Sequence, residues 1–517
     1  MVTHAERCAG AAASRMTQVK PHPVPDRYIG EMTSGRDHGP AHAADPWDWW
    51  RGTDELWRWG AHVREIWFDD LADDAARRST RRRRIAEMLG HARANSTFYR
   101  RHYRNVPEDC AELQAYPPVT RARLMAHFDD WVTDPQLRLH ELQAFIRDPE
   151  RIAEPWLGKY SVWTSSGTTG VPGIYVQDPE ALAVYAALLT IRFEFGPLTP
   201  DPWQLAGAPA RMALVAATGG HFAGVVWWER QCRLHPMLAA QTRVFSILEP
   251  IGELVARLNE WQPAFLGSYP TLLSLLEREQ REGRLDIHPR ALWSGGEALT
   301  ASERASIEQG FGCKVLEDYG ASECMQIAFG CRHGRLHLND DWVVLEPVDE
   351  HWRPVPAGQP SATVLLTNLA NRVQPVIRYD LGDSVTMDTT PCACNNRRPS
   401  VRVQGRRDDV LVLDGAGGAP VRVLPLAIET VIEEEAGIHR FQLTQTAHDA
   451  LCLRVEGHDA RQRASGCRRA AKALERFLKL QGIGRVGLTL DDCPPEANPV
   501  SGKLRRIRAL PAARIDL

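Results

Sequence analysis

The sequence of 517 residues has no apolar stretch that approaches the ~20 residues needed to cross a bilayer. Its N-terminus has no apolar segment of the length found in secretory signal peptides. The 11 cysteines are scattered along the chain, unlike the dense cysteines of small disulfide-stapled domains. These absences argue against membrane-spanning and secreted classes and predict a cytoplasmic protein.

An excess of charge of either sign is also lacking, because 62 basic residues face 65 acidic ones, for a net charge of −3. Bulk electrostatics therefore do not favour nucleic acid or an anionic membrane as partners. The basic run 77–84 leads into a helical stripe and predicts a solvated helix start rather than a nucleic-acid site. The tryptophan-rich stretch 46–60 predicts packing, with ligand binding as the alternative.

Three regions with different sequence textures follow one another along the chain. Residues 1–45 lack helix or strand periodicity and are expected to be poorly ordered. Between 46 and 404, helical patterns alternate with short apolar runs that end in glycine, as in 213–220 and 291–297. This alternation predicts a layered α/β domain with partly parallel sheets. Residues 405–517 carry alternating strands around one helix and predict a small α+β domain.

The strongest chemical signal is a run of small and hydroxyl-bearing residues before Val171 and Pro172. Such a segment can wrap a polyphosphate with backbone N–H groups and hydroxyls, at little steric cost. It is not a Walker loop, because that pattern of glycines followed by lysine is absent. A polar surface turn is the alternative for the segment alone. The run is Thr164, Ser165, Ser166, Gly167, Thr168, Thr169 and Gly170.

Four further segments are each weak alone but informative as an ordered set. A tyrosine that can stack on a base and a carboxylate suited to magnesium are found in 319–323. Asp383 follows a tight turn and could accept both ribose hydroxyls, 405–409 lies at the predicted domain boundary, and 501–503 presents a lysine on a glycine turn. Each of these segments could be an ordinary loop, but their joint occurrence in this order is hard to attribute to chance.

The five segments resemble the core motifs of the acyl-adenylate-forming (ANL) superfamily, in the same order. The details, including Gly295-Gly296-Glu297, are most similar to the phenylacetate–CoA ligase-like branch. The resemblance covers roughly residues 80–510. It implies a large ATP- and acid-binding N-terminal domain (46–404) and a small mobile C-terminal domain (405–517).

The resemblance also implies roles for individual residues. The segment from Thr164 to Gly170 would hold the β- and γ-phosphates, and Glu323 would bind Mg²⁺. Gly296, Glu297 and Tyr319 would line the adenine site, and Asp383 would take the ribose. Arg406 would assist at the ribose and phosphate, Asp408 would be the hinge, and Lys503 would bridge the carboxylate and the α-phosphate. One departure is that Val171 and Gly173 stand where many relatives carry a lysine near the phosphate loop.

A separate set of ligand-type residues consists of Cys331, His337, Cys392 and Cys394, three sulfurs and one imidazole. Together they could fill the four positions of a tetrahedral structural zinc. The spacing alone is weak evidence, and unrelated buried cysteines are the alternative. Some phenylacetate–CoA ligase-like proteins carry this pattern, so the resemblance implies Zn²⁺, with Cys324 and His333 as reserve ligands.

For the acid, the resemblance implies a pocket that includes His221, Tyr269, Trp293, Gly295 and Gly320. Two of these residues are aromatic and suggest a flat cavity, whereas His221 could equally be a hydrogen-bonded structural histidine. The predicted function is ATP-dependent activation of an acid, with an aromatic acid favoured, and transfer to coenzyme A. A carrier protein or amine acceptor, an unusual oxyacid, and a non-catalytic nucleotide-binding protein are the alternatives. The sequence names neither the acid nor the acceptor, and it leaves a homodimer open.

Overall fold

The computed structural model describes residues 48–496 and 506–509, apart from 111, 166–172, 194–210, 298, 350, 404–410, 424, 439 and 458. The extension 1–45 and the predicted domain boundary therefore lie outside the described residues. No helix in the described part of the chain combines the length and the apolar character needed to cross a membrane.

Helices occur in the N-terminal, central and C-terminal parts of the described chain. They are α2 (Asp48–Leu71), α3 (Asp74–Asn95), α4 (Thr97–His102), α5 (Arg121–Ala126), α6 (Phe128–Trp131), α7 (Leu139–Phe145), α8 (Pro179–Arg192), α9 (Ala223–Leu234), α10 (Pro236–Ala239), α11 (Ile251–Trp261), α12 (Pro270–Arg281), α13 (Ala301–Phe311), α14 (Pro425–Ala436) and α15 (Ala460–Leu480), with 3-10 turns η1 (Leu113–Ala115) and η2 (Pro149–Arg151).

The strands are mostly short and lie between these helices. They are β1 (Ser161–Thr164), β2 (Ile174–Gln177), β3 (Met212–Ala216), β4 (Thr242–Ser246), β5 (Phe265–Ser268), β6 (Ala291–Ser294), β7 (Lys314–Ala321), β8 (Cys324–Gly330), β9 (Leu336–Leu338), β10 (Val343–Val348), β11 (Thr363–Asn368), β12 (Tyr379–Asp380), β13 (Val385–Met387), β14 (Ser400–Val403), β15 (Leu411–Asp414), β16 (Pro420–Val423), β17 (Phe441–Ala447), β18 (Ala450–Val455), β19 (Gly487–Asp491) and β20 (Ile507–Arg508).

A mixed sheet of nine strands is the centre of the larger part of the molecule, in the order β13-β14-β9-β8-β7-β6-β5-β3-β4. The strands from β4 to β7 pair in parallel, whereas the pairs from β7 to β13 are antiparallel. Parallel strands need crossover helices, and α11, α12 and α13 supply the connections after β4, β5 and β6. The layered α/β domain predicted from the sequence is therefore confirmed.

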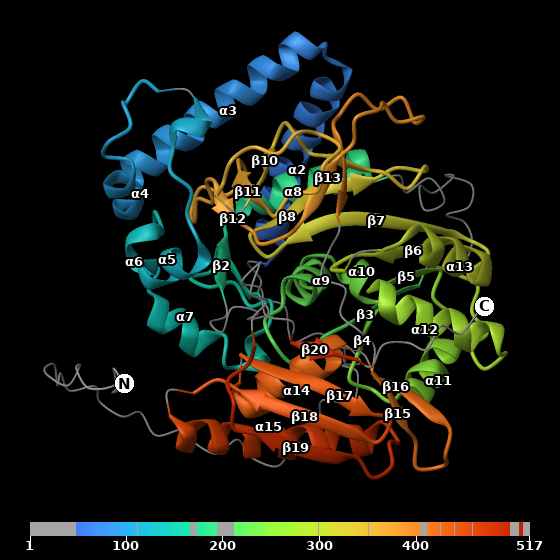
Figure 1. Ribbon diagram of the computed structural model, residues 1–517. Coiled ribbons are helices and arrows are strands. Elements are labelled where there is room, and N and C mark those ends of the chain that lie inside the picture. Colours follow the sequence, from blue (N-terminus) through green and yellow to red (C-terminus); the bar gives the residue numbers. More distant parts are fainter. Residues whose placement is uncertain are drawn as a thin grey trace, which may run out of the picture.

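The C-terminal residues form a smaller module, drawn in orange and red at the bottom of Figure 1. Its sheet has the order β19-β18-β17-β20, and α14 and α15 pack together beside it. The strands predicted around one helix in this region are present as β18 and β19 on either side of α15, and α14 is a further helix. The module shares one hydrophobic cluster with α11 and α12, which includes Leu254, Leu272 and Phe477.

Two expectations about the N-terminal helices need correction. Within the tryptophan-rich stretch, Trp59 donates a hydrogen bond from Nε1 to Thr190 Oγ1 at 3.1 Å, but Trp57 is 80% exposed and does not pack. Within the basic run, which is a continuous part of α3, Arg84 is buried rather than solvated. Its burial is compensated by hydrogen bonds that it donates to the backbone oxygen of Asp341 at 2.9 Å and to Glu65 at 2.7 Å.

Arg84 belongs to a buried charge network that joins the N-terminal helices to the central sheet. Arg192, at the end of α8, makes two hydrogen bonds of 2.7 Å to the two carboxylate oxygens of Asp341. Arg398 lies 3.2 Å from the same carboxylate and also contacts Asp70. Burial alone would raise the pKa of Asp341, but the charges of Arg192 and Arg398 hold it well below its usual value.

We expect Arg192→Met to lower the free energy of unfolding by roughly 3–5 kcal/mol, because it leaves Asp341 buried with less positive charge around it. The matched control is Arg101→Met, whose exposed ion pair to Asp130 should contribute within about 1 kcal/mol. Urea unfolding of the three proteins at neutral pH measures the difference. Equal midpoints for Arg192→Met and Arg101→Met would contradict the role given to the network.

The same ion pair predicts a pH dependence. Because the pKa of Asp341 is depressed in the folded state, its stabilisation is present above the unfolded pKa of about 4 and is lost as the pH falls below that value. Arg192→Met should therefore lose less stability than the wild type between pH 5 and pH 3 on the same urea assay.

Candidate functional site

A cavity of about 390 Å³ lies where the parallel strands end, between the central sheet and the C-terminal module. Ligand sites of open α/β sheets characteristically lie outside the carboxyl ends of the strands. Many residues singled out in the sequence line this cavity, namely Thr164, Ser165, Tyr269, Trp293, Gly295, Gly296, Glu297, Tyr319, Gly320, Glu323 and Asp383.

Glu323 lies at the tip of the β7–β8 hairpin. Since Ala321 pairs with Cys324, Ser322 and Glu323 form a two-residue turn. The Glu323 side chain is only 3% exposed, and its Oε1 accepts hydrogen bonds of 2.6 Å from the hydroxyls of Tyr175 and Tyr379. These donors satisfy one oxygen of a carboxylate that would otherwise be costly to bury.

Arg121 completes this arrangement from the start of α5. Its Nε donates to the Tyr379 hydroxyl at 3.2 Å, and its NH2 lies 3.7 Å from Glu323 Oε1. Burial raises the pKa of Tyr379, and the Glu323 charge adds to this effect, so the hydroxyl stays protonated and can donate. Arg121, Tyr175 and Tyr379 were not among the candidates from the sequence. No local motif distinguishes the first two, whereas Tyr379 lies four residues before the candidate Asp383.

The end of β1 lies against the same turn. The Thr164 N–H donates to the carbonyl oxygen of His221 at 2.7 Å, and the Ser322 hydroxyl donates to the carbonyl oxygen of Thr164 at 3.3 Å. Trp163 Nε1 donates to the Ser322 carbonyl at 2.8 Å. The predicted phosphate segment therefore begins beside Glu323. The remaining members of that segment, Ser166, Gly167, Thr168, Thr169 and Gly170, lie outside the described residues.

Tyr319 and Asp383 meet on another side of the cavity. The Tyr319 hydroxyl donates to Asp383 Oδ2 at 2.9 Å. Burial first, and then the Asp383 charge, raises the pKa of Tyr319 well above its usual value, so the phenol remains a donor at neutral pH. The aromatic residue and the aspartate that the sequence assigned to adenine and ribose are thus adjacent.

The glycines between β6 and α13 are required by the geometry of the turn. Gly296 has φ of +79°, and a Cβ on Gly295 would lie 2.7 Å from the Trp293 ring and 2.8 Å from Asp318 Oδ1. Glu297 then accepts a hydrogen bond from the N–H of Thr271 at 3.2 Å, at the first turn of α12. Positive φ and close ring packing both favour glycine here.

Two predicted pocket residues differ in their surroundings. Tyr269 lines the cavity, and its hydroxyl accepts from the Ala217 N–H at 3.3 Å; burial raises its pKa to about 12. His221 is buried but does not line the cavity, and its Nε2 hydrogen-bonds the Asp148 carbonyl at 3.0 Å while its ring packs on Phe145. These contacts favour the structural alternative for His221.

The four predicted metal ligands come together at a second place. Cys331 lies between β8 and β9, His337 lies in β9, and Cys392 and Cys394 lie between β13 and β14. The ligand atoms of all four lie within 4.8 Å of one another. Cys331 Sγ and Cys392 Sγ are 3.7 Å apart, and Cys394 Sγ lies 3.3 Å from His337 Nε2. His337 Nδ1 lies 3.0 Å from the Arg398 carbonyl, which can only accept, so Nε2 is left as the ligand atom. The reserve ligand His333 is exposed and Cys324 is elsewhere, beside Tyr185.

Three residues given chemical or hinge roles lie outside the described residues. They are Arg406 and Asp408, in 404–410, and Lys503, in 497–505. Their roles stay predictions.

Comparison with known proteins adds to this geometry, although no family model matches the chain. The chain is 27% identical over 287 residues to phenylacetate-coenzyme A ligase from Thermus thermophilus, covering 52% of this chain and 59% of that relative. It is 25% identical over 317 residues to the enzyme of the same name from Aromatoleum evansii, covering 57% and 65%. The matches thus span less than two thirds of the length of either relative.

Among solved structures, 2-hydroxyisobutyryl-CoA ligase in complex with 2-HIB-AMP and CoA superposes with a TM-score of 0.52. The identity is 22%, and the match covers 85% of this chain and 90% of that one. The chain therefore has the fold of the adenylate-forming CoA ligases. By sequence, the chain is similar over part of its length to these phenylacetate-coenzyme A ligases.

The shape of the Glu323 hairpin predicts the effect of one substitution. A Cβ on Gly320 would lie 2.2 Å from the backbone oxygen of Met325, which cannot move aside without breaking the hairpin. We expect Gly320→Ala to lower the free energy of unfolding by at least about 2 kcal/mol. Gly252→Ala in α11, with nothing within 4 Å of the added carbon, should leave it unchanged or raise it by up to about 1 kcal/mol. Urea unfolding compares them, and a Gly320→Ala midpoint at or above the wild-type value would refute the steric argument.

Proposed function

We propose that this protein uses ATP and Mg²⁺ to convert an aromatic carboxylic acid into its acyl-adenylate and then transfers the acyl group to coenzyme A. One observation carries the proposal: described members of four separate motif segments line a single cavity, at Thr164–Ser165, Gly295–Glu297, Tyr319–Glu323 and Asp383. Each segment alone is ordinary loop chemistry, whereas their convergence matches the parts of one nucleotide.

The roles follow from the chemistry of each group. Tyr319 would offer an aromatic ring to the adenine. Gly296 and Glu297 line the same cavity, and Gly296 has no side chain to obstruct a flat base. Asp383 is an acceptor for ribose hydroxyls, and its bond to Tyr319 fixes its orientation. Thr164 and Ser165 begin the hydroxyl-rich segment that would hold the phosphates.

Glu323 fits a magnesium site. Oε1 is occupied by two tyrosine hydroxyls, whereas Oε2 accepts no hydrogen bond from the described residues. A carboxylate oxygen is the hard ligand that Mg²⁺ prefers, and such an ion would neutralise phosphate charge next to the end of β1. Tyr175 and Tyr379 would hold the carboxylate in place without competing for the ion.

The C-terminal module supports a role for Lys503. Arg506 lines the cavity and is held by ion pairs to Glu429 and Glu433 on α14. Lys503 precedes Arg506 by three residues, a stretch of chain that spans at most about 10 Å. A lysine tethered this close can reach a ligand in the cavity and contact the carboxylate and the α-phosphate together.

The acceptor is inferred from relatives, because no described residue identifies it. The curated relatives are phenylacetate-coenzyme A ligases, and the solved neighbour was determined with an acyl-adenylate and CoA. A carrier protein or an amine as acceptor remains the alternative.

The test is an acid-dependent pyrophosphate-release screen of the full-length protein with ATP and Mg²⁺, run with and without coenzyme A. We expect pyrophosphate release with aromatic acids and a CoA thioester in the complete mixture. Release without thioester formation would move the acceptor to a carrier or amine, and no release with any acid would overturn the proposal.

Lys503→Ala should slow adenylate formation by at least ~10²-fold, comparable to losing one preorganised oxyanion donor. Attack of a carboxylate on the α-phosphate brings two anions together, and a compact ammonium can stabilise the charge developing between them. Thioester formation from preformed acyl-adenylate should change much less. The control is Lys479→Ala, an exposed lysine in the last turn of α15. Adenylation near the wild-type rate in Lys503→Ala would refute the assignment.

We also propose that Cys331, His337, Cys392 and Cys394 bind one structural zinc. Zn–S bonds of about 2.3 Å at tetrahedral angles put two sulfurs about 3.8 Å apart, close to the 3.7 Å between Cys331 and Cys392. The hydrogen bond from His337 Nδ1 to a backbone carbonyl is the orienting contact typical of zinc-bound histidines. All four positions come from protein, so the ion would hold strands together rather than take part in the reaction.

Freshly purified protein should contain close to one zinc per chain by elemental mass spectrometry, and Cys392→Ser should lose it together with thermal stability. The contribution to stability should be smaller than the ~10 kcal/mol seen when zinc folds a small domain, because here a large core remains. Cys493→Ser, an exposed cysteine outside the cluster, should keep the metal. Wild-type protein free of zinc without exposure to chelators would exclude the site.

A further inference from the structure

One face of the central sheet forms a floor in the cavity. In the parallel register Leu214 pairs with Gly267, and Gly267 pairs with Trp293. The side chains of Leu214 and Trp293 therefore point to the same face of the sheet, with Gly267 between them. Trp293 pairs with Leu316 on β7. Because side chains alternate along a strand, Asp318 lies on this face as well.

Helix α9 covers this face and closes a pocket over it. The first turn of α9 and the residue before it, 222–224, line the cavity, and Trp228 packs on Phe265 of β5 with ring centroids 6.3 Å apart. Two glycines make room for the Trp293 indole on the floor, since a Cβ on Gly267 or Gly295 would lie 2.9 or 2.7 Å from that ring. The result is a slot between helix and sheet, with Leu214 and the Trp293 indole on its floor.

Asp318 is an acidic residue in this slot. It lines the cavity, and its Oδ1 lies against Gly295, where an added Cβ would be 2.8 Å away. Its Oδ2 accepts a hydrogen bond from Gln326 Nε2 at 3.2 Å. Asp318 makes no ion pair with any described residue, unlike the neighbouring Glu317, which pairs with Arg304.

A carboxyl group without a cation is costly in this position for two reasons. Burial raises the pKa of Asp318 to about 7, against the hydrogen bonds from Gln326 and Trp293 that favour the charged form. A negative charge here would also repel an acid substrate bound as its carboxylate. A ligand that brings a hydrogen-bond donor to Asp318, and keeps its own carboxylate at the far end of the slot, would offset this cost.

We propose that Asp318 selects the acid, and that the substrate is an aromatic acid with an amino or hydroxyl group on its ring. This inference rests on the proposed function and names the substrate class of that same cavity. Leu214 and the Trp293 ring accept the aromatic plane, and Asp318 accepts the donor group of the ring. Asp318 was not among the candidates from the sequence, although it directly precedes Tyr319.

The competing explanation is that Asp318 accepts a hydrogen bond from the exocyclic amine of adenine. The alternation along β7 favours the acid, because the Tyr319 hydroxyl reaches Asp383, whereas the Asp318 carboxyl lies with Trp293 and Gln326. The two explanations predict effects on different substrates, so one set of kinetic measurements separates them.

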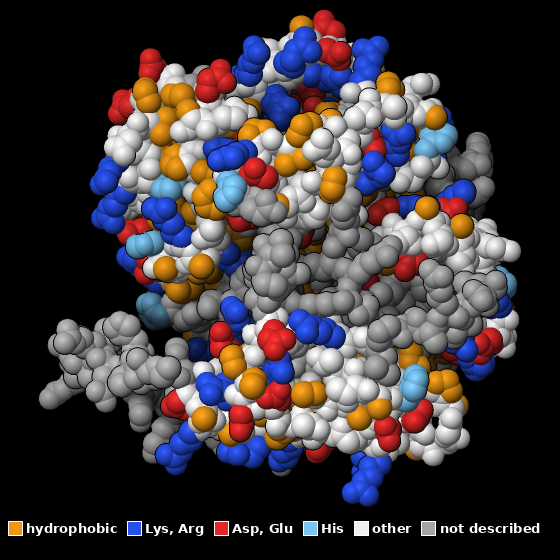
Figure 2. Space-filling view, viewed as in Figure 1, with side chains coloured by type: hydrophobic (Ala, Val, Ile, Leu, Met, Phe, Trp, Pro, Cys, Tyr) orange, Lys and Arg blue, Asp and Glu red, His pale blue; other side chains and the backbone are white. Residues whose placement is uncertain are grey.

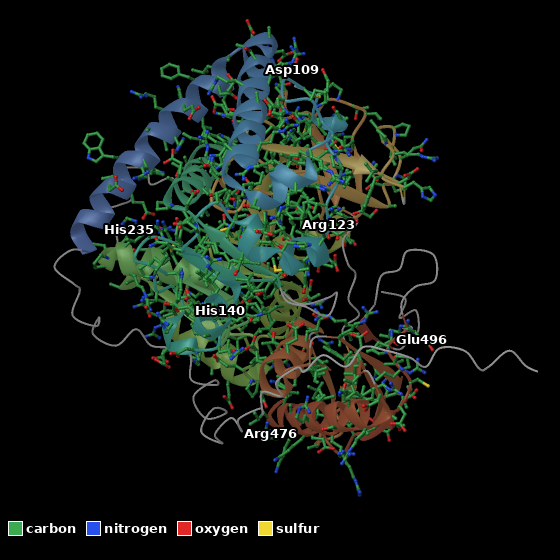
Figure 3. All side chains as sticks on the ribbon, turned by 90° about the vertical axis from the view of Figure 1, so that its left-hand side faces the viewer. Asp109, Arg123, His140, His235, Arg476 and Glu496 are labelled. Carbon is green, nitrogen blue, oxygen red and sulfur yellow. The ribbon has the colours of Figure 1, made fainter. Side chains whose placement is uncertain are left out.

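The experiment measures kcat/KM for pyrophosphate release with matched aromatic acids, each carrying a ring amino or hydroxyl group or a methyl group at the same position. The wild type should prefer the best donor-bearing acid over its methyl counterpart by at least ~10-fold. Asp318→Leu, similar in size but without an acceptor, should remove or reverse this preference, and Asp318→Asn should retain part of it. Asp109→Asn is the control, an exposed carboxylate at the top of the molecule, far from the cavity (Figure 3).

Each outcome is decisive. A wild type without preference for donor-bearing acids overturns the inference even if the Asp318 variants do not fold. An unchanged preference in Asp318→Leu also overturns it, and a raised KM for ATP with that preference intact assigns Asp318 to the adenine. If none of the acids causes pyrophosphate release, the proposed function itself is overturned. That result is distinct from release with every acid without discrimination between them.

Discussion

The buried carboxylate of Glu323 is the interaction on which the shape of the cavity depends. A buried charge without partners is strongly unfavourable, so the hairpin tip can occupy this position only when its donors are in place. Tyr175 comes from β2, Tyr379 from β12 and Arg121 from the start of α5. A single side chain thus requires the two-stranded sheet β1-β2, the three-stranded sheet β10-β11-β12 and helix α5 to be assembled together.

The switch in strand direction at β7 explains why the cavity forms at this point. Up to β7 the strands run in parallel and their glycine-rich ends open at one edge, whereas β8 turns back along β7. The turn between them projects Glu323 over the edge where β5 and β6 end. On the face of the molecule in Figure 2, the basic and acidic side chains of the described residues are interspersed.

The sequence was sufficient to predict the elements and motifs that depend on local pattern. The strands 213–216 and 291–294 followed from local pattern. The four zinc-type ligands, Tyr319 and Asp383 were singled out by residue type together with the resemblance to a known family. Contacts that depend on tertiary packing were not predictable, because Tyr175 lies 148 residues from Glu323 and neither residue type nor spacing marks it. The exposed Trp57 shows the same limit: helical spacing identifies a face of a helix, but not whether anything covers it.

The contact between the C-terminal module and the rest of the chain places a limit on the proposed two-step reaction. Gln481 Nε2 donates to the Leu248 carbonyl at 2.7 Å, and the Glu434 carboxylate lies against Gly220 in the loop that follows β3. Apolar side chains of α11 and α12 pack on the module in the same contact, and exposing them would cost about 25 cal/mol per Å².

A module that turns between adenylate formation and acyl transfer must therefore cover a similar apolar area in its second orientation. Two docked states of nearly equal free energy are compatible with turnover, whereas one much tighter state would hold the protein in a single step. The contact with Gly220 further links the orientation to the site, because the loop after β3 leads directly into the residues 222–224 of the cavity wall. Gly220, which the module touches, lies two residues before Phe222 in the cavity wall, so a change in the module's orientation would alter the packing next to that wall.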